Sequence, residues 1–240
     1  MATTSRSWAE SYLHALTAEF TPLADGDRAA AMRAYMKDVA PFFGIAAQPR
    51  RAAQKRALSI AGPPATDDVA ETMGLLWAQP EREFHYAACE LFGRLATSLH
   101  AGILRNPITE LLVTKPWWDT VDSLGTPGIT TVVREHPELS VVIDEWSSTD
   151  DQWLIRAAIQ HQRGRKGDTD IPRVLQLCSD HADDRRFFVS KAIGWALRDL
   201  TRLDPAAVAG FLETHPDLPA VARREADRGL ARVTQQTARS

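Results

Sequence analysis

Apolar residues recur along most of the chain at steps of three and four, which is the spacing of one face of an α-helix. The segment opened by Pro80-Glu81-Arg82-Glu83 is a clear example, because its apolar residues follow this spacing: Phe84, Ala87, Ala88, Leu91, Phe92 and Leu95. Similar segments follow acidic or proline-containing openings, which favour helix N-termini, at 67–71, 148–151, 183–186 and 204–205. Alternating β-branched runs are short, and Asn-Gly and Asp-Gly hairpin turns do not occur. The pattern predicts an all-α protein with roughly a dozen helices.

A second regularity is a short motif that returns every 35 residues. Its copies are Arg51-Ala52-Ala53, Tyr86-Ala87-Ala88, Val121-Asp122-Ser123, Arg156-Ala157-Ala158 and Lys191-Ala192-Ile193. Small residues at one position of successive units let neighbouring helices approach closely as they stack, which is typical of an α-solenoid. The first position holds Arg51, Arg156 and Lys191, and predicts a basic line along one side of such a solenoid.

The middle copy departs from this pattern, because Asp122 stands where the other copies have alanine. A buried carboxylate without a partner is costly, so an aspartate at a packing position favours a functional role at the edge of a groove. Trp118 lies four residues before Asp122 and shares its face of a helix. A carboxylate beside an aromatic plane suits a substrate that is, or becomes, positively charged. The alternative is a core tryptophan beside a capping or solvated aspartate.

Composition is that of an ordinary globular protein, with 44% apolar and 25% charged residues among 240. No apolar run is long enough to span a bilayer, and the N-terminal residues lack an apolar signal core, so we expect a cytoplasmic monomer. Cys89 and Cys178 stand in apolar surroundings and predict buried free thiols. The histidines show no metal-ligand spacing, so we expect no metal site.

The net charge of −3 gives no overall attraction to nucleic acid. Basic residues nevertheless gather in three clusters, at 50–56, 163–166 and 185–198. A solvated surface is the ordinary explanation of such clusters, and a surface that follows DNA phosphates is the alternative.

Several motifs in order along the chain resemble those of the AlkD-like DNA alkylpurine glycosylases, which are built from HEAT-like helical repeats. The matching stretches begin with Ala34-Tyr35-Met36-Lys37, Phe42-Phe43-Gly44-Ile45, Arg82-Glu83-Phe84 and the run from Val113 to Asp122. They continue with Trp153-Leu154-Ile155-Arg156-Ala157-Ala158-Ile159, the run from Phe187 to Arg198, and Arg223-Arg224-Glu225-Ala226. The most specific are Trp-Trp-Asp-x-Val-Asp and Lys-Ala-Ile-Gly-Trp-x-Leu-Arg. The resemblance implies a single C-shaped α-solenoid over residues 1–240, with loosely packed ends at about 1–6 and 233–240 and a concave face that binds duplex DNA.

The resemblance also implies roles for individual residues. Asp122 matches the catalytic carboxylate, and Trp118 and Trp195 match cleft aromatics that flank the lesion nucleotide without a base-flipping pocket. The expected substrate and DNA contacts are Tyr35, Arg156, Arg51, Lys191 and Arg198. For Arg51, Lys191 and Arg198, a solvated surface role is as compatible with the sequence as a phosphate contact.

The implied chemistry needs only one carboxylate. A purine alkylated at N3 or N7 is cationic and departs as a neutral base, so no general acid has to protonate it, unlike the leaving oxygen in ordinary glycoside hydrolysis. One carboxylate stabilises the oxocarbenium-like deoxyribose and aligns the attacking water. This chemistry requires no cofactor, and we expect none. We therefore expect a monofunctional glycosylase of base excision repair that removes bases such as 3-methyladenine and 7-methylguanine. The alternatives are a noncatalytic binder of DNA structures, a protein-interaction scaffold, and a glycosylase specialised for bulky adducts.

Overall fold

The computed structural model describes residues 6–237 of the chain, and these residues contain helices and no strand. The all-α class predicted from the apolar spacing is therefore confirmed. The chain divides into two compact units, residues 1–132 and 133–240. Of the predicted loose ends, residues 1–5 and 238–240 lie outside the described part of the chain, while helix α14 continues to Thr237.

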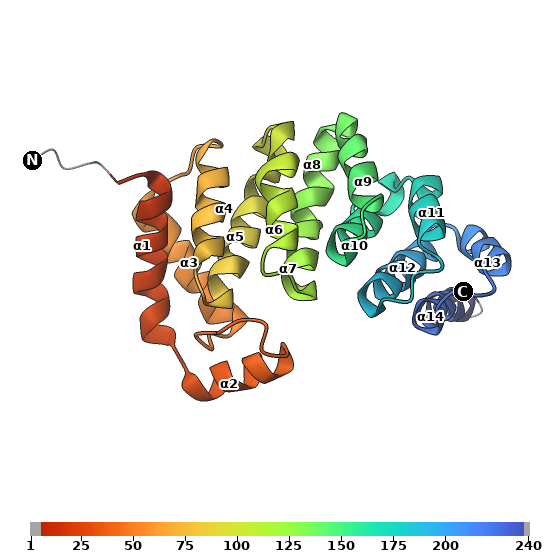
Figure 1. The fold of residues 1–240 in the computed structure, drawn as a ribbon, viewed down its shortest axis with the longest axis horizontal. Coiled ribbons are helices and arrows are strands. Elements are labelled where there is room, and N and C mark those ends of the chain that lie inside the picture. Colours follow the sequence, from red (N-terminus) through yellow and green to blue (C-terminus); the bar gives the residue numbers. More distant parts are fainter. Residues whose placement is uncertain (1–5, 238–240) are drawn as a thin grey trace, which may run out of the picture. The chain divides into compact units, whose positions relative to one another are not determined.

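The first unit is a stack of helices, with one long loop between α2 and α3 (Figure 1). Its α-helices are α1 (Trp8–Phe20), α2 (Gly26–Tyr35), α3 (Ala47–Ala61), α4 (Asp68–Ala78), α5 (Arg82–Leu95), α6 (Thr109–Val113) and α7 (Trp118–Ser123). Its shorter helical segments are η1 (Thr21–Leu23), η2 (Ala96–Ser98), η3 (Ala101–Ile103), η4 (Leu104–Ile108) and η5 (Leu124–Ile129). Helix α1 packs on α3 and α4, α4 packs on α5, and α5 contacts both α3 and α7. The helix α8 (Thr130–Glu135) follows η5.

The second unit alternates between two layers of helices (Figure 1). It contains α9 (Ser140–Ser147), α10 (Gln152–Gln160), α11 (Ile171–Asp180), α12 (Phe187–Leu200), α13 (Pro205–Thr214) and α14 (Ala220–Thr237), with η6 (Pro137–Leu139) and η7 (Lys166–Asp168). Helix α12 packs between α10 and α14, and each of α9, α11 and α13 packs on the helix that follows it. This order of contacts is that of an α-solenoid, the fold that the repeat predicted.

The repeat and the helix starts agree with the structure. The five copies of the short motif that returns every 35 residues fall in α3, α5, α7, α10 and α12. Asp151, in one predicted opening, accepts hydrogen bonds from the backbone N–H groups of Trp153 and Leu154 at 2.8 and 3.0 Å, so it caps α10. Both cysteines are buried free thiols, as predicted, and burial raises their pKa values.

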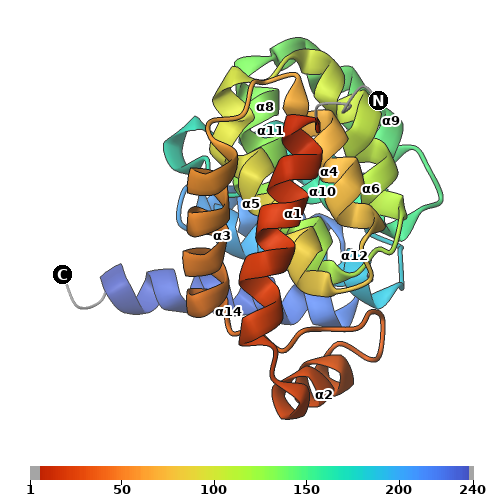
Figure 2. The same cartoon turned by 90° about the vertical axis from the view of Figure 1, so that its left-hand side faces the viewer.

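Helix α2 differs from its neighbours because none of its residues is buried. It lies across the end of the stack that α1 and α3 form, outside their layer (Figures 1 and 2). Its sequence is rich in alanine and charged residues, so it lacks the apolar stripe that would dock it lengthwise. Its position depends on the loop that follows it, and that loop matters to the candidate site.

Candidate functional site

The candidate catalytic residues lie on the short helix α7, and the loop before it is fixed to the end of α4. Lys115 Nζ donates to the carbonyl oxygens of Trp77 and Gln79 at 2.8 and 3.0 Å, where the C-terminal carbonyl groups of α4 lack helical partners. In return, Trp77 Nε1 donates to the carbonyl oxygen of Thr114 at 2.8 Å. These reciprocal bonds set the point at which α7 begins.

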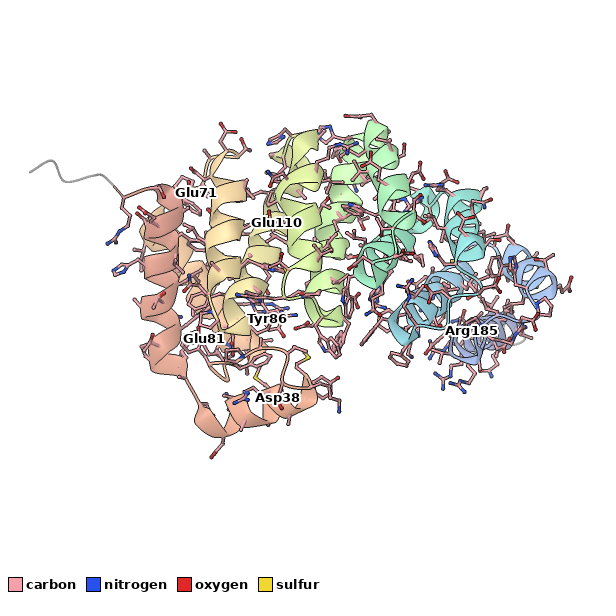
Figure 3. All side chains as sticks on the ribbon, viewed as in Figure 1. Asp38, Glu71, Glu81, Tyr86, Glu110 and Arg185 are labelled. Carbon is pink, nitrogen blue, oxygen red and sulfur yellow. The ribbon has the colours of Figure 1, made fainter. Side chains whose placement is uncertain are left out.

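A buried ion pair then holds the first turn of α7 against α5. Arg82 is fully buried, and its Nη2 and Nε donate to Asp119 Oδ1 and Oδ2 at 2.7 and 3.0 Å. The same guanidinium donates to Thr120 Oγ1 at 2.9 Å and to the carbonyl oxygen of Lys115 at 2.8 Å. Tyr86, labelled in Figure 3, donates its hydroxyl to Asp119 Oδ2 at 2.7 Å. Burial and the Asp119 charge raise the pKa of Tyr86, so its phenol stays a donor.

This anchoring leaves the next face of α7 open to a groove. Trp118 and Asp122, one helical turn apart, both line a cavity of about 890 Å³ within the first unit. Both side chains are half-buried. The ring of Tyr35 meets the ring of Trp118 edge-on, with centroids 6.4 Å apart, and Tyr35 is 70% exposed. The structure thus brings together three predicted site residues from α2 and α7.

The loop after α2 is positioned by a second buried carboxylate. Glu83 is fully buried and accepts hydrogen bonds from the backbone N–H groups of Phe43, Gly44 and Ile45 at 3.0, 2.9 and 3.0 Å. Gly44 has a φ of 85°, and a Cβ there would lie 2.2 Å from the carbonyl oxygen of Asp25, so only glycine fits. Glu83 therefore fixes the chain that returns from α2, and with it the place of Tyr35.

Another part of the groove lining carries mixed charge. Glu90 accepts from Arg50 at 2.7 Å and from Arg51 at 3.1 Å, and the guanidinium of Arg50 lies 5.1 Å from the ring centroid of Tyr86. Arg50 is buried, whereas the side chain of Arg51 is 67% exposed. Of this pair, Arg51 is the one that a phosphate in solvent can reach.

The other predicted site residues lie in the second unit and gather around one indole. Four cationic groups lie near the ring centroid of Trp195, namely Arg163 at 4.9 Å, Arg156 at 5.1 Å, Lys191 at 5.9 Å and Arg198 at 6.0 Å. We call these four residues and Trp195 the indole cluster. Because four cations already lie near the ring, the cluster attracts an anion and repels a further cation.

Glu225 on α14 orients two members of the indole cluster. It accepts from Lys191 at 3.0 Å and from Arg198 at 2.6 Å, and it is almost completely buried. Burial acts to raise the pKa of Glu225, but the hydrogen bonds and charges of Lys191 and Arg198 outweigh it and lower this pKa. Glu225 is therefore a fixed negative charge behind the cluster.

Arg156 differs from the exposed arginine that the repeat indicated. It is 1% exposed, and its Nη1 donates to the carbonyl oxygen of Phe188 at 2.8 Å. Arg51 is largely exposed and Lys191 is partly exposed. The three basic residues at the first repeat position therefore do not form one solvent-facing line, because Arg156 is enclosed by its own apolar helix.

Sequence analysis missed the roles of Arg82, Glu83, Glu90 and Glu225. The sequence carried a signal for Arg82 and Glu83, because they directly precede the apolar face of α5. Charged side chains at such a position become buried and need partners of opposite charge or hydrogen bonds. Among residues 6–237, no group of three potential metal ligands comes together. Within the same range, no helix combines the length and the apolar character needed to cross a membrane.

Comparisons with known proteins agree with this arrangement. A model of the DNA alkylation repair enzyme family matches residues 16–230. A solved structure described as a predicted DNA alkylation repair enzyme from Enterococcus faecalis aligns with a TM-score of 0.80 and 26% identity, over 87% of this chain and 97% of that chain. A search among curated proteins gives no match.

Proposed function

Because the chain belongs to the DNA alkylation repair enzyme family, we propose that it is a monofunctional DNA glycosylase that hydrolyses the N-glycosidic bond of cationic N3- or N7-alkylated purines in duplex DNA. Membership of a DNA repair family implies that DNA is the partner of this protein. The observation that carries the proposal is the groove of the first unit, where Asp122 and Trp118 lie one helical turn apart beside Tyr35. We further propose that the protein acts as a monomer in the cytoplasm, on the nucleoid when bound to DNA.

Asp122 is the proposed catalytic carboxylate. As the C1′–N bond breaks, its electron pair moves to the purine, which loses its positive charge and departs neutral. Positive charge then develops on the deoxyribose, and a carboxylate near C1′ stabilises it. The carboxylate also accepts a hydrogen bond from the water that adds to C1′ and takes up the proton that this water releases. The product is an abasic site and a free base, and no covalent enzyme intermediate is required.

Trp118 and Tyr35 are the proposed lesion contacts. An indole face attracts a cation by about 0.5–2 kcal/mol, depending on desolvation, and this attraction is absent for an undamaged, neutral purine. The edge-on contact between the two rings holds Trp118 in place on its solvent side. Asp122 lines the same groove and adds a negative charge one helical turn from Trp118, whereas the charge of Glu90 is balanced by Arg50 and Arg51.

DNA binding is the proposed role of the indole cluster and of Arg51. Trp195, Lys191 and Arg198 are half-buried and together offer an aromatic ring and cations to a sugar-phosphate unit. Arg156, which is enclosed, acts through Trp195 by supporting its ring. A role for Trp195 beside the lesion then rests on contact with the sugar, since the surrounding cations disfavour a cationic base.

The groove volume favours one second candidate, a glycosylase whose substrates include bulky alkyl adducts. A cavity of about 890 Å³ leaves room beyond a methylated base, near the upper end of the 300–1,000 Å³ that is usual for small-molecule sites. Comparing excision of 7-methylguanine with that of a bulky N3-adenine adduct distinguishes the two preferences.

The decisive experiment is incubation with duplex DNA that carries one N7-methylguanine, followed by assay of abasic sites. We expect excision by the wild type and a loss of at least a hundredfold in Asp122→Asn, with unchanged DNA affinity. Asp227→Asn, on the exposed face of α14, is the matched control and should excise normally. Excision that survives Asp122→Asn would remove Asp122 from the mechanism, and tight binding without excision of either lesion class would favour a noncatalytic binder.

A further inference from the structure

A second pocket, apart from the groove, lies wholly within the second unit. It has a volume of about 400 Å³ and opens between the end of α10, the turn after it and the C-terminal half of α12. Its apolar lining includes Ile159, Val174, Leu200 and Leu203, and one of its walls is Trp195. A flat aromatic wall over an apolar floor suits a planar ligand.

The charged residues of this pocket favour an anion. Arg163, Lys166 and Arg202 line it together with a single carboxylate, Asp199. Arg163 lies 3.9 Å from Asp199 and 4.9 Å from the Trp195 ring centroid, so part of its charge is already balanced. Lys166 and Arg202 are exposed and reach a group at the mouth. Among the remaining cations of the indole cluster, Lys191 and Arg198 are balanced in part by Glu225.

A buried amide supplies a specific donor. Gln162 lines the pocket, is 5% exposed, and accepts a hydrogen bond at its Oε1 from the backbone N–H of Asp170 at 2.7 Å. This bond assigns the amide orientation, because a backbone N–H requires an oxygen acceptor. Among residues 6–237, no protein acceptor is bonded to Gln162 Nε2. Nε2 is not among the fully buried side-chain atoms without a partner, so it is open to the pocket, and a ligand atom that accepts a hydrogen bond fits there.

We propose that this pocket binds a nucleoside 5′-monophosphate unit. The base lies against Trp195 and offers a ring nitrogen or carbonyl oxygen to Gln162 Nε2, and the phosphate lies at the mouth beside Lys166 and Arg202. Base stacking on aromatic side chains tolerates any base because each has a π-face, and the four cations near the indole exclude a cationic alkylpurine. The unit comes either from a strand of DNA displaced from its stack or from a free nucleotide. The inference does not rest on the proposed excision activity, because neither Asp122 nor Trp118 belongs to this pocket.

Calorimetric titration with dAMP, deoxyadenosine and inorganic phosphate tests the assignment. We expect dAMP to bind at least tenfold more tightly than deoxyadenosine or phosphate alone, since only dAMP fills both parts of the site. Ala196 lines the pocket and is half-buried, so Ala196→Phe fills the cavity and should weaken dAMP at least tenfold. Lys166→Asn removes a charge at an exposed position, and asparagine tolerates the left-handed φ of 55° there. It should weaken dAMP but not deoxyadenosine.

The proposal is overturned if dAMP and phosphate bind with equal affinity, or if Ala196→Phe leaves the affinity for dAMP unchanged. Either result would mean that the anion binds at the protein surface and the base does not enter the pocket. Lys166→Asn keeps the test informative if Ala196→Phe unfolds, since it replaces an exposed side chain. A single-stranded oligonucleotide with 2-aminopurine separates the two sources. Fluorescence quenching in the wild type but not in Ala196→Phe identifies a strand nucleotide, and dAMP binding without such quenching identifies a free nucleotide. Asp122→Asn should bind dAMP normally, so failure of the pocket and failure of the excision proposal are seen separately.

Discussion

Replacing Asp119 by alanine should destabilise the protein more than any change at the rim of the groove. The carboxylate accepts three short hydrogen bonds, two from Arg82 and one from Tyr86, and the Arg82 side chain is fully buried. Removing one partner of a buried pair leaves an uncompensated charge, which costs about 3–5 kcal/mol. Two neutral acceptors, Thr120 Oγ1 and the carbonyl oxygen of Lys115, remain for Arg82 and place the expected loss toward the lower end of that range.

Urea unfolding followed by far-ultraviolet circular dichroism measures this loss as a shift of the midpoint. Asp67→Ala is the matched control, because Asp67 is exposed and makes no side-chain capping bond at the start of α4. It should stay within about 0.5 kcal/mol of the wild type. A loss below about 1 kcal/mol in Asp119→Ala would refute the role of the pair as the anchor of α7, since neutral hydrogen bonds alone account for that much.

A combined replacement separates the ion pair from the packing around it. Arg82→Met, Tyr86→Phe and Asp119→Leu together remove both charges of the ion pair and the phenol that donates to it, while keeping apolar volume. Replacing a buried pair by apolar residues is often neutral or stabilising, so the triple variant should recover most of the stability that Asp119→Ala loses. If the triple variant is less stable than Asp119→Ala, the ion pair itself contributes to the free energy of unfolding, beyond the cost of leaving Arg82 unpaired.

Three further outcomes are expected. Trp118→Ala should reduce excision of 7-methylguanine at least tenfold, while Trp118→Phe retains part of it, as measured under single-turnover conditions, because a smaller π-face attracts the cation more weakly. Burial, as the main cause, lowers the pKa of His161 to about 4, so the unfolded chain binds a proton at a higher pH than the folded one. Stability should therefore fall as the pH drops from about 6.5 to 4, and urea titrations should show a smaller fall in His161→Gln. The pKa of Glu225 is lower in the folded protein than in the unfolded chain, so ionised Glu225 stabilises the fold at pH values above the ordinary glutamate pKa. This stabilisation is lost as the pH falls through the pKa of the folded state. Glu225→Gln should therefore show a smaller loss of stability at acid pH in the same titration.

The fold was predictable because its signals are local. Helix starts such as Asp204-Pro205 carry their own capping chemistry, and the structure begins α13 at Pro205 with the Asp204 side chain accepting from the N–H of Ala207 at 2.8 Å. The apolar spacing of α5 and the 35-residue repeat need no knowledge of distant residues. Both led to the all-helical solenoid.

The surroundings of the site were not predictable, because they depend on partners far apart in the chain. Arg82 and Asp119 are 37 residues apart, and no local pattern pairs them. Arg156 is an example of burial that a local pattern does not give, since its place in a motif predicted a DNA contact and said nothing of its enclosure. Its neighbours on both sides, from Trp153 to Ile159, are all buried, and a charge inside such an apolar run is more simply an enclosed one that must find a carbonyl oxygen and an aromatic ring.

The distribution of charge gives each unit a different electrostatic task despite a net charge of −3. In the first unit Asp122 lines the groove while Glu90 is paired with Arg50 and Arg51, whereas in the second unit four cations lie within 6.0 Å of one indole. At physiological ionic strength exposed charges are largely screened beyond about 8 Å, so a bound group responds to the charges beside it and not to the total. A cationic base then belongs beside Asp122 and a phosphate beside the indole cluster. Weak overall attraction to DNA is thus compatible with strong local contacts, and the acidic total is no argument against a nucleic-acid substrate.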